Sequence, residues 1–328
     1  MTPLNVSAIL FCFYVNGLFE LLRKRKSGCW IQGVYSGVLG YADDNFLIAP
    51  TKESLQEMLD TCHEYASQYN LQFSTNPNPE KSKTKCLLFS KRKKEIVEKL
   101  TLGENKLPWV NSGKHLGNTL ENVLNGMKKD MAIKRATYIN RNNELSQEFY
   151  FCDPETKFKL NRIYNSHFTG SPLWDLFSKE AKMVENSWSV SFRMMYSLPR
   201  NTHRYFVEPI SGLPHIKTTL IKNFLGFIEQ IELTPKSVAK SLLETIKYDV
   251  RSTTGSNLRN IMQLMGKESI DDLCKNHTQE LKFVPVPPEE EWRIGFLNEL
   301  LMTKQNKAEL ANFSHEEINA LIYDISTT

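Results

Sequence analysis

Residues 37–49 read GVLGYADDNFLIA, and this stretch decides the fold. Two short apolar runs, residues 38–42 and 46–49, lie on either side of the pair Asp43-Asp44. Apolar runs that flank a short polar segment predict two antiparallel strands joined as a β-hairpin. Gly40 has no side chain, so we expect a ligand or another part of the backbone to approach closely there.

Two neighbouring carboxylates at the tip of a hairpin make a candidate site for a hard cation. Carboxylate oxygens are the ligands that Mg²⁺ prefers, and a turn lets successive side chains converge on one ion. The plainer interpretation is that Asp43, Asp44 and Asn45 are there because Asp and Asn are common turn residues. The turn by itself leaves both interpretations open.

The segments on both sides of this hairpin set the fold class. Apolar residues recur at steps of three and four from Lys52 to Tyr69, which predicts one amphipathic helix. Residues 71–73 and 86–89 are short apolar runs that predict further strands. Beyond Leu120 the strand pattern fades, and helical periodicity occurs in residues 127–147, 154–168, 181–196, 216–231 and 235–248. The sequence therefore predicts an α+β fold with a helical second half.

Four segments, in order, resemble the motifs of reverse transcriptases from non-LTR retrotransposons. Residues 7–16 read SAILFCFYVN, which is similar to the family segment S-P-x-L-F-x-x-Y-x-N, with Ala8 where proline is usual. Residues 37–50 resemble the family's catalytic hairpin. Residues 78–89 resemble its lysine-bearing motif, and His115-Leu116-Gly117 resembles its primer-grip hairpin.

This resemblance covers at least residues 7–215 and implies RNA-directed DNA synthesis, with an RNA template, a DNA primer and dNTPs as partners. Two Mg²⁺ ions would stabilise the attacking 3′-oxygen and the leaving pyrophosphate. By motif position, Asp43 would ligate metal directly and Asp44 would support it. Tyr41 and Ala42 would line the primer end beneath the new base pair.

The other two motifs supply the remaining residues that the resemblance assigns. Lys81 would protonate or screen the departing pyrophosphate, and Lys83 is the second candidate for that position. Gly117 would contact the primer. The alternative for either lysine is a solvated or phosphate-binding charge without a catalytic role.

Part of the family's active site has no counterpart in these 328 residues. The two-metal site needs a third aspartate from an earlier palm strand, and no segment like D-x-x-x-A-F-D occurs. The Gln-Gly that precedes Ser7 in the family and the fingers subdomain are absent too. We therefore expect Mg²⁺ to bind weakly or not at all, and the missing amino-terminal fingers and palm portion to be a required partner for catalysis.

The resemblance also predicts how the chain is divided. Residues 1–124 would be a partial palm, residues 125–215 a helical thumb or connector, and residues 216–328 a helical carboxyl-terminal region. The first thumb helix is basic, and we expect four of its cations to contact a nucleic-acid backbone: Lys128, Lys129, Lys134 and Arg135. The alternative is a solvated helix face.

Net charge, cysteine content and hydropathy limit the kinds of partner, bound metal and cellular location that are expected. The net charge of +4 gives only weak support for an anionic partner, and the six cysteines contain no CxxC pair, so neither a zinc site nor a disulfide framework is predicted. We expect an intracellular protein, in the cytoplasm or nucleus. Residues 4–22 are almost apolar enough for a membrane anchor, but Asn5, Ser7, Asn16 and Glu20 interrupt them. This favours a buried amphipathic helix over a membrane span.

Overall fold

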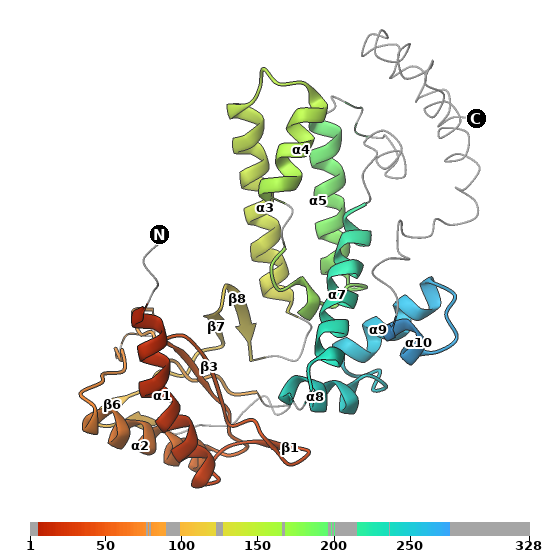
Figure 1. Cartoon of the computed structure of the whole chain (residues 1–328). Helices are drawn as coiled ribbons and strands as arrows, with labels where there is room; N and C mark the ends of the chain where they lie inside the picture. Colours follow the sequence, from red (N-terminus) through yellow and green to blue (C-terminus); the bar gives the residue numbers. More distant parts are fainter. Residues whose placement is uncertain are drawn as a thin grey trace. The chain divides into compact units, whose positions relative to one another are not determined.

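The computed structural model describes residues 6–76, 78, 80–89, 99–122, 127–165, 168–195, 198, 200, 215–235 and 237–275. Helices alternate with small antiparallel strand pairs in the first part of the chain and follow one another in the second (Figure 1). The predicted α+β class is thus confirmed. The chain forms two compact units, residues 1–125 with 231–245 and residues 126–230 with 246–328.

Two helices form one side of the first unit, α1 (Val6–Lys24) and α2 (Lys52–Gln68). The α2 helix begins at Lys52 because the Thr51 side chain accepts a hydrogen bond from the Ser54 amide at 3.2 Å, which satisfies one of the free amides at the helix start. It ends near Asn70, whose backbone is left-handed. The periodicity that begins at Lys52 therefore correctly predicted this helix.

The strands in the described residues of the first unit form four β-hairpins. Each joins its two strands through a two-residue turn. The pairs are β1 (Trp30–Ile31) with β2 (Val34–Tyr35), β3 (Val38–Tyr41) with β4 (Asp44–Leu47), β5 (Thr101–Leu102) with β6 (Asn105–Lys106), and β7 (Ser112–His115) with β8 (Asn118–Glu121). The first loop residue has a positive φ in all four turns, which matches the right-handed twist of paired strands: Gln32, Ala42, Gly103 and Leu116.

The core of the first unit lies between the two helices and the segments around the hairpins. Leu18 and Leu22 of α1 pack with Met58 of α2 and with Leu100 and Leu107. Leu22 and Met58 are completely buried. The later part of the apolar segment near the start of the chain thus packs within a protein core, whereas Phe13 is 75% exposed. No helix among the described residues has the length and hydropathy to cross a membrane.

Two predicted strands of this unit are wrong. Residues 71–73 have no strand structure, and of residues 86–89 only Cys86 forms a β-bridge, to Trp109. The Leu71 amide instead donates to the Ala66 carbonyl at 2.9 Å, which ties this segment to the end of α2. An apolar run can be buried without pairing as a strand, and periodicity alone does not distinguish the two cases.

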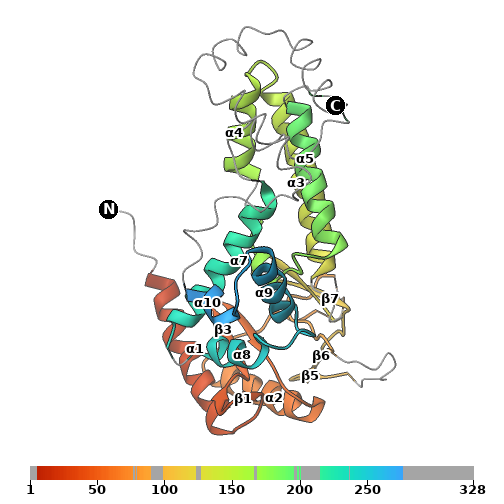
Figure 2. The same ribbon diagram turned by 90° about the vertical axis from the view of Figure 1, so that its right-hand side faces the viewer.

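The second unit is helical (Figures 1 and 2). Its elements are α3 (Lys128–Glu148), α4 (Pro154–Asn165), the 3₁₀ turn η1 (Ser171–Leu173), α5 (Lys179–Met195), most of α7 (Ile216–Leu233), α9 (Thr253–Leu264) and α10 (Ile270–Lys275). The short α8 (Val238–Ile246) follows α7, and residues 231–245 group with the first unit. Helices near residues 127–147, 154–168, 181–196, 216–231 and 235–248 were all predicted, whereas α9 and α10 were not.

Aromatic side chains fill the core of the second unit. Trp174, Phe192 and Phe224 are completely buried, and Tyr138 is 1% exposed. The Trp174 indole donates to the Asp130 carboxylate at 2.9 Å. Because Trp174 is completely buried, it is a core residue and its ring is not accessible to a base.

Candidate functional site

The acidic turn lies at the tip of the β3–β4 hairpin. The strand register pairs Tyr41 with Asp44, which leaves Ala42 and Asp43 as the two loop residues. All four residues are exposed, Tyr41 to 68%. The hairpin predicted from the sequence is therefore confirmed, and both carboxylates are accessible to a cation from solvent.

The backbone of this turn is strained. Ala42 has a φ of 51°, a left-handed conformation that costs a residue with a side chain roughly 1–2 kcal/mol. The other three two-residue turns each place a glycine at a loop position of positive φ, namely Gly33, Gly103 and Gly117, whereas this turn contains none. Gln32 and Leu116 have φ values of 47° at the same loop position, so left-handed backbone at a residue with a side chain occurs in three of the four turns and does not set the acidic turn apart.

One face of the β3–β4 hairpin contacts the β7–β8 hairpin. Because side chains alternate along a strand and Leu39 pairs with Phe46, these two residues lie on the same face as Tyr41 and Asp44. The Phe46 ring packs against the His115 ring of β7, with centroids 5.1 Å apart. The predicted metal-binding turn and the predicted primer-binding hairpin are thus brought together through this aromatic contact.

The opposite face of the hairpin packs on α1. A Cβ atom at Gly40 would lie 2.5 Å from the Phe19 ring and 3.3 Å from Asn45 Oδ1. The sequence predicted that a ligand or backbone would approach Gly40, and the neighbour is instead a side chain of the same unit. Period-two alternation from Asp44 would have pointed to Phe46, but the sequence offers no signal for the contact between Phe19 and Gly40.

The predicted primer-binding and lysine segments lie around β7. Gly117 has a φ of 78° at the β7–β8 turn, and no atom lies within 4 Å of where its Cβ would be, so this turn is open. Lys81 and Lys83 are exposed on the loop that precedes the Cys86 bridge. Leu87, just after that bridge, packs against Gly113 of β7, at 3.3 Å from the position of a Cβ there.

The donor atoms at the acidic turn suit Mg²⁺, but their number does not. Asp43 and Asp44 supply carboxylate oxygens, which are hard ligands. Among the described residues no group of three or more His, Cys, Asp and Glu side chains is arranged to hold a metal. Two ions bridged by protein carboxylates need more oxygens than two adjacent side chains provide, so no chemical step follows from these residues alone.

The four cations predicted to contact nucleic acid differ in what surrounds them. Lys134 is paired with the buried Asp130 at 3.0 Å and donates to the Thr169 carbonyl. Arg135 donates to the Ser187 hydroxyl at 2.7 Å, and Lys128 is 3.2 Å from Glu180. Lys129 is exposed. Contacts inside the second unit therefore engage Lys134 and Arg135, and their binding of nucleic acid stays a prediction.

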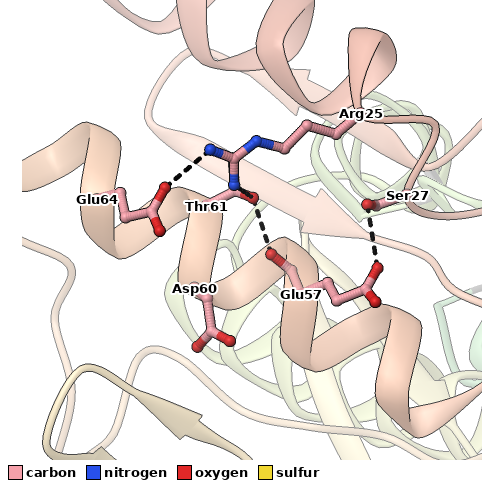
Figure 3. A pocket seen from close by; sticks show the side chains of 6 residues that line it. All are labelled: Arg25, Ser27, Glu57, Asp60, Thr61 and Glu64. Carbon is pink, nitrogen blue, oxygen red and sulfur yellow. Dashed lines mark hydrogen bonds and ion pairs between the residues drawn. The ribbon is translucent and has the colours of Figure 1, made fainter.

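An open hollow of about 430 Å³ lies between the end of α1 and α2 (Figure 3). Arg25 crosses it and donates to the Thr61 hydroxyl at 2.7 Å and to Glu64 at 2.9 Å. Glu57 and Asp60 line the same hollow. Arg25 thereby ties the segment that follows α1 to α2.

The thiols of Cys62 and Cys86 are unreactive at neutral pH. Burial raises the pKa of the Cys62 thiol to about 12 and that of Cys86 to about 11. Both stay protonated at neutral pH, and a thiol is a poor nucleophile and metal ligand. The geometry therefore gives no support to cysteine chemistry at these two positions.

Comparison with known proteins adds no relative. Neither a protein-family model nor a curated protein matches the sequence.

Proposed function

We propose that this chain is part of an RNA-directed DNA polymerase of the non-LTR retrotransposon type. In this proposal the first unit holds the later portion of a polymerase palm and the helices after residue 125 begin the thumb. Asp43 and Asp44 would contribute two of the carboxylates around the catalytic Mg²⁺ ions. The remaining metal ligand and the fingers would come from polypeptide other than these 328 residues.

The acidic hairpin turn is the observation that carries this proposal. Its exposed carboxylates lie at the tip of a two-residue turn with a strained backbone at Ala42. The contact between Phe46 and His115 supports the same proposal, because it brings the second motif-bearing hairpin alongside the first.

Iron-mediated cleavage tests the metal site without requiring polymerase activity. Fe²⁺ is added in place of Mg²⁺ together with hydrogen peroxide and ascorbate. Bound Fe²⁺ reduces the peroxide to a hydroxyl radical and a hydroxide ion, ascorbate returns the resulting Fe³⁺ to Fe²⁺, and the radicals cut the nearby backbone. We expect mass spectrometry to find cuts around residues 41–46 of the full chain. Asp43→Asn combined with Asp44→Asn should abolish those cuts.

The acid-lined hollow between α1 and α2 supplies the matched control. Glu57→Gln combined with Asp60→Asn removes the same amount of charge from the same unit, and it should leave the cuts around the turn unchanged. Cuts confined to α2, or cuts at the turn that persist without both aspartates, would contradict the assignment of the site.

A further inference from the structure

We draw no further inference here: the strongest candidate, the exposed apolar stripe that Met183, Val190 and Met194 form along the solvent-facing side of α5, is an unpartnered helix face, and nothing in the part of the chain that the structure describes shows what covers it.

Discussion

The methyl group of Ala42 makes the left-handed backbone of the acidic turn unfavourable. Replacing Ala42 by glycine removes the clash that makes a φ of 51° unfavourable, a relief of roughly 1–2 kcal/mol, and adds about 0.4–1 kcal/mol of unfolded-state entropy. We expect Ala42→Gly to raise the free energy of unfolding by about 0.5–1 kcal/mol in urea denaturation. Ala49→Gly, at an ordinary φ, should lower it by a similar amount.

A buried carboxylate holds the second unit together at one point. Asp130 is 1% exposed and binds both the Trp174 indole and Lys134. Asp130→Ala leaves both groups without this acceptor, and we expect the free energy of unfolding to fall by about 3 kcal/mol. Asp130→Asn keeps an oxygen acceptor for the indole and should cost less. Equal stability of Asp130→Ala and the unaltered chain would contradict this account.

The buried thiols predict a difference in reactivity and a pH effect. Cys12 is exposed, whereas burial raises the pKa values of Cys62 and Cys86. Iodoacetamide at pH 8 should therefore modify Cys12 first, as followed by mass spectrometry. The unfolded thiols ionise near pH 9, whereas the folded ones stay protonated. Their contribution to the free energy of unfolding is therefore fully present below pH 9 and is lost as the pH rises toward 12. Cys62→Ala should reduce that alkaline loss.

At the scale of elements, the close approach of α1 to β3 depends on Gly40. An added Cβ would meet the Phe19 ring at 2.5 Å, so Gly40→Ala should lower the free energy of unfolding by about 1–2 kcal/mol. Combining it with Phe19→Ala should cost less than the sum of the two single changes, by about 1 kcal/mol. Gly113→Ala, whose nearest neighbour is Leu87 at 3.3 Å, should not couple to Phe19.

Local sequence signals predicted the elements whose ends are marked by local chemistry. The acidic hairpin was predicted because apolar runs flank Asp43-Asp44, and α2 because apolar residues recur at helical steps from Lys52. Residues 71–73 were mistaken for a strand because Leu71 and Phe73 are apolar, and these side chains pack against the core of the first unit without strand pairing, which an apolar run does not reveal. The helix α9 was missed although Ser252 caps it, since its hydroxyl accepts from the Gly255 amide at 2.9 Å.

In the candidate site, too, features set by neighbouring residues could be predicted and contacts between residues far apart in the sequence could not. The residues of the turn and their exposure follow from the hairpin sequence, and Gly117 follows from its own two-residue turn. The contact between Phe46 and His115 joins positions 69 residues apart, and no periodicity connects them.

At the scale of the whole molecule, we expect these 328 residues to lack polymerase activity on their own. Two adjacent carboxylates provide too few protein oxygens for two Mg²⁺ ions. A primer-extension assay with an RNA template, a DNA primer, dNTPs and Mg²⁺ should detect no incorporation. Extension that survives Asp43→Ala would show that the active site lies elsewhere.

The two units are interleaved along the chain, and this has a consequence for inheritance. The first unit takes residues 231–245 from beyond most of the second, and the Gln32 side chain donates to the Thr245 hydroxyl at 2.8 Å. A single recombination breakpoint anywhere in the gene therefore leaves at least one unit incomplete. We therefore expect the coding sequences of the two units to be inherited together. Replacing one unit with that of another gene needs more than one crossover.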